Sequence, residues 1–231
     1  MATASLALAQ GAFVVDHDWV ATGGLAIGQQ GVIHIATGAA IAAYDADGVQ
    51  LWHRPGEGVQ NVAVDRQGNT YGVGAGILVK LDAGGTVQWA VAPEGQVRSV
   101  ATDAEGHIYL AGYRDGLSGG QARPEDMIIA KYDTDGQRLW QFSITNVLGR
   151  CRYPCHRTQE PSIAVDANGM LHVVGYFTGT IDVDPGVSVK ALDAGASMDV
   201  FVARYDADGQ YLNAFRVGGD PQGQNKAMIS P

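Results

Sequence analysis

The sequence predicts an all-β fold and, within that class, a β-propeller. Two observations carry this prediction: the chain has 32 glycines in 231 residues, and it repeats two hairpin-like segments four times each. A glycine content about twice the usual value, without proline richness, indicates many tight turns and therefore many short strands. No stretch keeps a helical period of apolar residues, which argues against helical repeats.

The first repeated segment has an apolar strand, an Asp-x-x-Gly turn and a second strand with an aromatic residue. Its copies cover 61–74, 99–112 and 162–175, and a fourth copy at 24–34 has Gly28 in place of the Asp. An Asp side chain can accept hydrogen bonds from backbone N–H groups two residues on, and Gly tolerates a positive φ. Each copy is therefore a predicted β-hairpin with one buried face.

The second repeated segment also turns at Asp-x-x-Gly, and a Trp follows four residues after the Gly. The Trp residues are Trp52, Trp89 and Trp140, and the last copy has Asn213 instead. Two hairpins in succession make a four-stranded antiparallel sheet, which is one propeller blade. A Trp in each repeat could suggest a quinone cofactor, but we interpret these rings as packing between blades. We expect no cofactor.

The spacing of the repeats supports the propeller. Gly31, Gly68 and Gly106 are 37 and 38 residues apart, close to the roughly 40–45 residues of a blade. The next interval, from Gly106 to Gly169, is longer because residues are inserted at 116–125 and 148–160, and a further insertion follows at 178–198. Such insertions map to loops on one face of a propeller, where binding surfaces usually lie.

The fullest copy, residues 162–219, resembles the bacterial SBBP-type β-propeller repeat, and shorter copies such as 41–74 are also similar to NHL-type and quinoprotein-type repeats. The resemblance covers about residues 24–219. It implies a bacterial protein that is secreted or lies at the cell surface. Propellers of this kind usually have more than four blades, so the chain is expected to be either a fragment of a larger propeller or a small propeller closed by its terminal strands.

The predicted organisation is a tail at 1–12 and a single propeller domain at 13–231. Ala7-Leu8-Ala9 resembles the small-x-small site of a signal peptide. The tail is therefore either the remnant of an export signal or an ordinary frayed terminus. An extracellular or cell-envelope location is expected.

Charge and hydropathy limit the partners. The formal net charge is -9, which argues against a nucleic-acid partner because phosphate binding needs a basic surface. No segment is long and apolar enough to span a membrane. The expected partner is a protein or carbohydrate ligand.

Two carboxylates form a candidate metal site. Asp182 and Asp184 alternate along an extended segment before Pro185-Gly186, so both side chains point the same way. With loop carbonyls they could hold Ca²⁺, and the alternative is a Pro-Gly turn with solvated acids. The Asp-rich turns, such as Asp45-Ala46-Asp47-Gly48, are interpreted as plain hairpin turns.

Cys151 and Cys155 flank Arg-Tyr-Pro in an inserted loop. A local disulfide is expected if the protein is exported. A zinc site would need further ligands beside His156, and two free thiols would fit a cytosolic protein.

No catalytic residue is identified. His34 and His172 take the position that Tyr71 and Tyr109 fill in other copies, which predicts packing roles. The first hypothesis is therefore a secreted or surface propeller that acts as a binding or scaffold module. The alternative is an enzyme, a lyase or a hydrolase, with its site at the mouth of the central channel.

Overall fold

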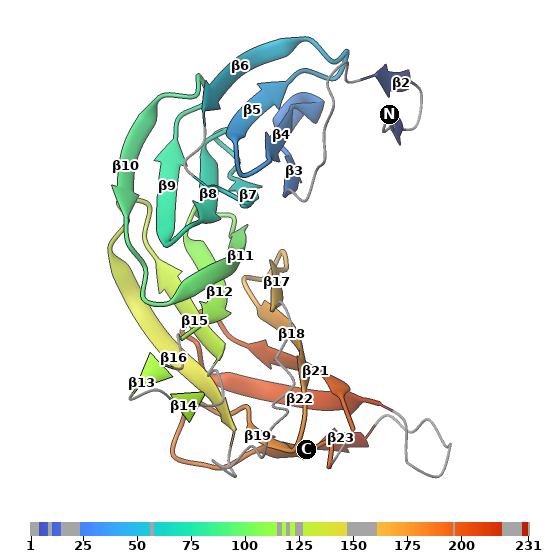
Figure 1. Cartoon of the computed structure of the whole chain (residues 1–231), viewed down its shortest axis with the longest axis vertical. Coiled ribbons are helices and arrows are strands. Elements are labelled where there is room, and N and C mark those ends of the chain that lie inside the picture. The colour runs from blue at the N-terminus through green and yellow to red at the C-terminus, as the bar shows by residue number, and fades with distance from the viewer. Residues whose placement is uncertain are drawn as a thin grey trace. The chain divides into compact units, whose positions relative to one another are not determined.

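The computed structural model describes residues 24–55, 58–114, 127–145, 161–195 and 197–218 in full, and the backbone alone of 5–8, 11–14, 117–118, 121–122, 146 and 228–230. In this part of the chain the fold is an all-β propeller (Figure 1), with one short 3-10 turn, η1 (Gln29–Gly31). The chain divides into two compact units, Met1–Ala92 and Pro93–Pro231. Each unit holds two blades.

Unit 1 contains blades 1 and 2, each a four-stranded antiparallel sheet whose strands follow chain order. Blade 1 consists of β3 (Leu25–Ile27), β4 (Ile33–Ala36), β5 (Ala40–Tyr44) and β6 (Gln50–Pro55). Blade 2 consists of β7 (Asn61–Val64), β8 (Thr70–Gly74), β9 (Ile77–Leu81) and β10 (Val87–Val91). The short strands β1 (Ser5–Leu8) and β2 (Gly11–Val14) pair with each other.

Unit 2 contains blades 3 and 4, which are extended by extra strands. Blade 3 consists of β11 (Gln96–Thr102), β12 (Ile108–Tyr113), β15 (Met127–Tyr132) and β16 (Arg138–Asn146). Blade 4 consists of β17 (Ser162–Val165), β18 (Leu171–Phe177), β21 (Asp199–Tyr205) and β22 (Tyr211–Val217), with β23 (Met228–Ser230) at its edge. A small hairpin pairs β13 (Leu117–Ser118) with β14 (Gln121–Ala122).

The insertion predicted at 178–198 folds as a hairpin. Its strands are β19 (Thr180–Asp182) and β20 (Ala191–Asp193), and β19 pairs with the end of β16. The insertion between two strands of blade 4 therefore extends the sheet of blade 3. This contact joins the insertion of blade 4 to β16, the outer strand of blade 3.

The predicted hairpins are confirmed. The first repeated segments form β3–β4, β7–β8, β11–β12 and β17–β18, and the second form β5–β6, β9–β10, β15–β16 and β21–β22. The Gly of each predicted turn has a positive φ, for example 82° at Gly68 and 87° at Gly106. In the copy that lacks the Asp, Gln30 also has a positive φ, of 58°.

The burial of the central strands differs from the expectation of one buried face. Every residue of β5, β8 and β15 is buried, whereas the outer strands β6 and β10 are largely half-buried or exposed. Within each unit, one face of β5 and one face of β15 pack against the other blade. Alternation along the sequence therefore underestimates burial in this fold.

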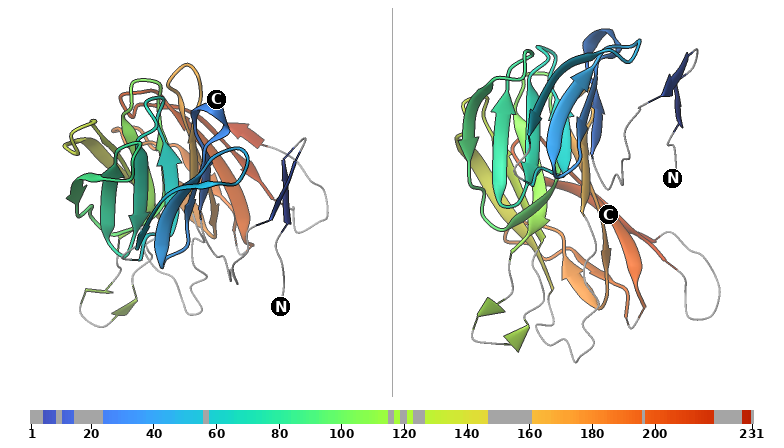
Figure 2. Two further views of the ribbon diagram at one scale, coloured as in Figure 1. Left: turned by 90° about the horizontal axis from the view of Figure 1, so that it is seen from above. Right: turned by 45° about the horizontal axis from the view of Figure 1, so that its top comes forward.

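The core of each unit lies between its two blades. In unit 1 it joins Ile41 of blade 1 to Val62, Val79 and Leu81 of blade 2. In unit 2 the core is larger, and Figure 2 shows the strands that enclose it from two further sides. Its largest members from blade 4 are Phe177, Phe201 and Tyr205.

No helix in the described part of the chain has the length and apolar character that a membrane span requires. The predicted boundary between a tail at 1–12 and a domain at 13–231 stays a prediction.

Candidate functional site

The Asp of each turn holds the turn closed. Its Oδ1 atom accepts hydrogen bonds from the backbone N–H groups two and four residues on, at 2.8–3.1 Å, in all seven copies. The carboxylates of Asp45, Asp133 and Asp206, which superficially resemble calcium ligands, are among them. The structure thus places these residues in hairpin turns.

In two copies of the first repeated segment, the Oδ2 atom of the turn Asp also accepts a hydrogen bond from a tyrosine. Asp65 Oδ2 accepts from the Tyr71 hydroxyl at 2.9 Å, and Asp103 Oδ2 accepts from the Tyr109 hydroxyl at 3.2 Å. Both tyrosines are fully buried. Burial raises the pKa of Tyr71 and Tyr109, and the neighbouring carboxylates raise it further. The tyrosine at this position was predicted to pack in the core, and its hydroxyl also stabilises the turn.

His34 shows what happens where the Asp is missing. Gly28 offers no carboxylate, and the Nδ1 atom of His34 instead lies 2.8 Å from the Thr70 hydroxyl of blade 2. The His34 ring also meets Trp52 edge-on, with 6.0 Å between centroids. Burial lowers the pKa of His34. These contacts describe a neutral packing histidine between blades, as the sequence predicts.

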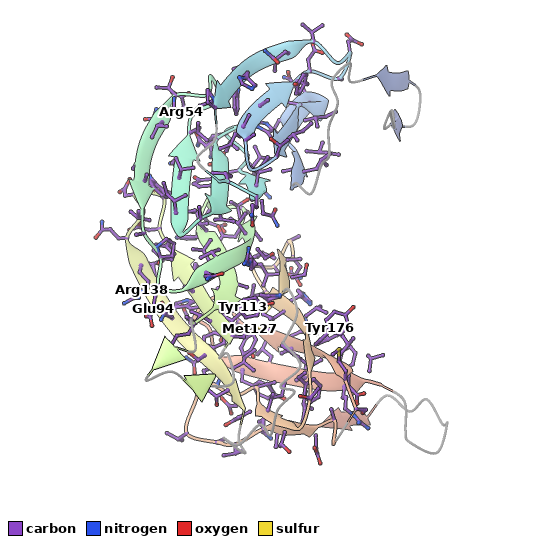
Figure 3. All side chains as sticks on the ribbon, in the orientation of Figure 1. Arg54, Glu94, Tyr113, Met127, Arg138 and Tyr176 are labelled. Carbon is purple, nitrogen blue, oxygen red and sulfur yellow. The ribbon has the colours of Figure 1, made fainter. Side chains whose placement is uncertain are left out.

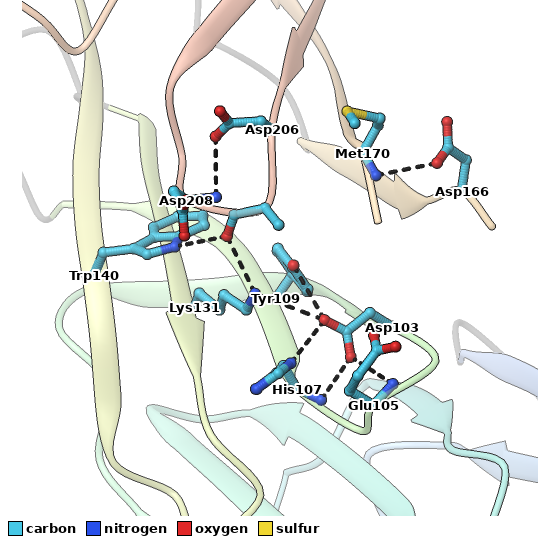
Figure 4. A network of polar contacts seen from close by, with 11 residues as sticks. Asp103, Glu105, His107, Tyr109, Lys131, Trp140, Asp166, Met170, Asp206 and Asp208 are labelled. Carbon is cyan, nitrogen blue, oxygen red and sulfur yellow. Dashed lines mark hydrogen bonds and ion pairs between the residues drawn. The ribbon is translucent and has the colours of Figure 1, made fainter. Parts of the chain in front are cut away.

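The densest polar cluster surrounds Asp103 in unit 2 (Figure 4). Asp103 Oδ2 lies 2.9 Å from His107 Nδ1 and 3.7 Å from Lys131 Nζ. The Asp103 side chain is 3% exposed and that of Lys131 is 8% exposed, whereas His107 is 32% exposed. Burial alone would raise the pKa of Asp103, but hydrogen bonds from His107 and the charge of Lys131 outweigh it and hold the pKa below its usual value.

This cluster connects blade 3 to blade 4. Lys131 Nζ donates to the carbonyl of Ala207 in a turn of blade 4 at 3.1 Å, and Trp140 Nε1 donates to the same carbonyl at 3.2 Å. Lys131 Nζ also lies 4.8 Å from the centre of the Tyr109 ring, a cation–π contact. Sequence reasoning missed this connection, because Lys131 and Ala207 are far apart in the chain.

Asp103, Glu105 and His107 form the one group of three metal-ligating side chains found among the described residues. The ammonium of Lys131 lies next to the Asp103 oxygen that a cation would need, and that oxygen already has two hydrogen-bond partners. A second positive charge at this point would be repelled. The arrangement therefore supports a structural ion pair better than a metal site.

Trp52 and Trp140 also pack between blades, as predicted. Trp52 Nε1 donates to the Ala83 carbonyl of blade 2 at 3.0 Å, the same contact that Trp140 makes with Ala207. A side chain at Gly85 would clash with the Trp52 ring, since its Cβ would lie 2.6 Å from Trp52 Cδ2. The Gly of the turn is thus needed both for its positive φ and for room beneath the indole.

A buried ion pair that the sequence did not predict lies in blade 4. Asp199 is 2% exposed, and its carboxylate accepts from Arg216 Nη1 at 2.6 Å and from the Ser197 hydroxyl at 3.0 Å. Gly218 lies against this carboxylate, where a Cβ would clash. The sequence signal that could have revealed this ion pair is Asp199 itself, an acidic residue on the apolar face of a predicted strand.

The carboxylates proposed for calcium lie at the end of β19. Asp182 Oδ1 accepts from the backbone N–H groups of Asp184 and Lys190, at 3.1 and 3.0 Å, and Asp184 Oδ1 accepts from Gly186 N–H at 2.8 Å. Among the described residues these two carboxylates do not gather a third acidic, His or Cys ligand. Their binding of Ca²⁺ stays a prediction. Cys151 and Cys155 lie outside the described residues.

If Asp182 and Asp184 bind Ca²⁺, adding the ion will raise the melting temperature of the protein, because a ligand that binds the folded state stabilises it. A chelator should reverse the shift, and Asp182→Asn with Asp184→Asn should abolish it. Asp206→Asn, in a turn that shares the acidic composition, is the matched control and should leave the shift in place. Equal melting curves with Ca²⁺ and with chelator would reject the site.

One face of blade 4 is open, although the equivalent face of blade 3 is covered. Val174 is 36% exposed, whereas Ala111, at the same register of blade 3, is 0% exposed. Val217 is 50% exposed, and its counterpart Ile144 is 5% exposed. We call the half-buried and exposed apolar side chains Val174, Tyr176, Val200, Val202, Phe215 and Val217 the open face of blade 4. Figure 3 labels Tyr176 on this blade.

A scan against protein-family models found no match, and neither did a search of the curated proteins. Solved structures match over most of the chain. A streptogramin B lyase structure is 11% identical, with a TM-score of 0.50, 91% of this chain covered and 84% of that chain. A structure of BBS1N in complex with ARL6DN is 13% identical, with a TM-score of 0.51 and coverages of 88% and 67%. A chain of the mitotic checkpoint complex is 10% identical, with a TM-score of 0.50 and coverages of 89% and 72%. At these identities the likeness supports the propeller fold alone.

Proposed function

We propose that this chain is a binding and scaffold module of the SBBP-type propeller class, secreted or held at the cell surface, that binds through the open face of blade 4. The observation that carries the proposal is the exposure of apolar side chains whose counterparts in blade 3 are buried under a neighbouring blade. An apolar face of this kind is costly to leave in water and marks an interaction surface. The partner that fits it is another blade, and we commit to a second copy of this chain.

Blade 1 carries the features that the open face would need in its partner. Its turn Asp45-Ala46-Asp47-Gly48 has the same sequence as the blade 4 turn at 206–209, whose Ala207 carbonyl accepts from Lys131 and Trp140. Leu25 on blade 1 is 46% exposed, whereas its counterpart Ile163, covered in the core of unit 2, is 9% exposed. The contact of blade 3 with blade 4 could therefore be repeated between blade 4 of one copy and blade 1 of another.

Blade 4 also carries donors for such a contact. Arg204 and Asn213 occupy the positions that Lys131 and Trp140 hold in blade 3. The Nε atom of Arg204 is buried and has no hydrogen-bond partner in the structure described here. A carbonyl at the position of Ala46 in a second copy would satisfy it, because an unpaired buried donor costs about 1–3 kcal/mol.

A protein partner is compatible with two of the similar structures. One similar structure is a propeller solved with a bound protein, and another comes from a multiprotein complex. The similarity to a streptogramin B lyase supports the enzyme alternative instead. The feature that an enzyme could use is His107, half-exposed and oriented by the buried Asp103. Turnover that disappears in His107→Ala would establish that alternative.

We expect the wild-type chain to self-associate as its concentration rises, and Val174→Asp to keep it monomeric. The carboxylate would place an unpaired charge in an apolar contact, which is strongly unfavourable. Sedimentation velocity measures the effect, and circular dichroism verifies the fold. Leu139→Asp, which changes an exposed apolar residue on β16 that is 51% exposed, is the matched control and should associate like the wild type. A wild-type chain that stays monomeric at every concentration contradicts the proposal.

A further inference from the structure

A cavity of about 190 Å³ lies between blades 1 and 2 of unit 1. Its walls are apolar and come from both blades, chiefly Ile41, Val59, Val79, Leu81 and Val87. Arg54 on β6, labelled in Figure 3, is the charged residue in its lining. The pocket is partly open to solvent, and the gap that it leaves between two packed blades needs an explanation.

The explanation comes from the equivalent place in unit 2. Phe142, two residues after Trp140, fills the gap between blades 3 and 4: it stacks on Trp140 with 5.6 Å between centroids and meets Tyr205 at 4.8 Å. In unit 1 the residue two after Trp52 is Arg54, and Leu81 stands where unit 2 has Tyr205. Two aromatic rings are thus replaced by a smaller apolar side chain and a cation.

The guanidinium of Arg54 is available to a ligand. Arg54 is exposed and makes no hydrogen bond or ion pair with another described residue. Most other arginines of the described part have such partners, as Arg216 has Asp199 and Arg114 has Glu94. A guanidinium that has no partner among the described residues and lies beside an apolar cavity is suited to a carboxylate, which it can bind through two parallel hydrogen bonds.

We infer that this cavity binds a small organic carboxylate whose apolar body is about the size of one aromatic ring. An engineered apolar cavity of about 150 Å³ binds benzene, so a cavity of about 190 Å³ accommodates one ring or a short branched chain. The ring would occupy the place of Phe142 in unit 2, and the carboxylate would meet Arg54. All residues involved belong to unit 1, so the site is independent of the open face of blade 4.

The test is a calorimetric titration of the whole chain with phenylacetate and with its neutral isostere, phenylacetamide. Saturable binding of phenylacetate is expected, with phenylacetamide weaker by about tenfold or more, because a hydrogen bond to a charged group contributes at least that factor. Arg54→Gln should weaken phenylacetate to the level of the amide. Arg66→Gln, a change at an exposed arginine in the turn of blade 2, is the matched control and should leave binding unchanged.

A second variant separates a ligand site from a simple packing defect. Arg54→Phe restores the residue found in unit 2, so it should raise the melting temperature and abolish phenylacetate binding. Equal affinity for the acid and the amide, no binding of either, or unchanged affinity in Arg54→Gln at an unchanged melting temperature would each overturn the inference.

Discussion

Replacing Asp103 with Ala is expected to lower the free energy of unfolding by about 3 kcal/mol, since removing one partner of a buried ion pair leaves the other charge uncompensated. The change removes the two turn hydrogen bonds, the partner of the Tyr109 hydroxyl and the counter-ion of Lys131. Lys131 would then be buried between blades with the Ala207 carbonyl as its remaining polar contact. Urea denaturation followed by circular dichroism measures the loss.

Asp133→Ala is the matched control for this prediction. The Asp133 carboxylate accepts the same two backbone hydrogen bonds in its turn, at 3.0 and 2.8 Å, and has no further hydrogen bond or ion pair with a described residue. Its loss should cost about 1 kcal/mol, the net value of ordinary hydrogen bonds. Equal effects of the two substitutions would show that Asp103 closes a turn and does nothing more.

The same carboxylate should make stability depend on pH in the acid range. The pKa of Asp103 in the folded protein lies below the ordinary value of 3.8. Its contribution is therefore complete above that value and is lost as the pH falls through the folded pKa. Asp103→Asn should be less stable than the wild type at neutral pH, and the difference should shrink in acid. A difference that stays constant below pH 3.8 would contradict the assignment.

Trp140→Ala is the second substitution with a large expected effect, about 3 kcal/mol, the lower end of the range for removing a large aromatic side chain from a core. Trp140 stacks on Phe142, meets Tyr109 edge-on at 5.9 Å and donates to the Ala207 carbonyl. It therefore contributes both packing and a hydrogen bond to the contact between blades 3 and 4.

Trp140→Phe separates these two contributions. An aromatic ring remains in the contact and the indole N–H donor is lost, so we expect the free energy of unfolding to fall by about 1 kcal/mol. Circular dichroism is the suitable readout, because the substitution changes the tryptophan fluorescence itself. If Trp140→Ala and Trp140→Phe were both nearly neutral, the indole would not hold the blades together.

The hairpins could be predicted because each is encoded within about ten neighbouring residues. Asp-x-x-Gly specifies the turn by local hydrogen bonds and a positive φ, and these act whatever surrounds them. The packing roles of His34 and Trp52 were also predictable, since their positions repeat. Calcium binding at Asp182 and Asp184 was suggested because the two acidic residues alternate along an extended segment. The backbone N–H groups that donate to these carboxylates belong to a loop whose conformation the alternation does not reveal.

What could not be predicted depends on contacts between distant segments. Lys131 and the Ala207 carbonyl belong to different blades, and nothing near Lys131 in the sequence indicates that partner. The open face of blade 4 illustrates a second limit. The strand at 171–177 has the same pattern as the strand at 108–113, so the sequence does not show which face is covered. The cavity beside Arg54 follows from a comparison of two interfaces, which requires the structure.

The central claim, that the open face of blade 4 is the binding surface, can be tested by crosslinking two copies. One chain carries Asn213→Cys, the other carries Ala46→Cys, and both carry Cys151→Ser and Cys155→Ser. Asn213 and Ala46 occupy the positions of Trp140 and Ala207, which are in contact in unit 2. An indole spans the gap between these two positions, which is too long for a direct disulfide, so mixing the chains with a short bifunctional maleimide should give a crosslinked dimer. A yield no higher than that from a control chain with Gln67→Cys, at an exposed turn residue, would contradict the claim.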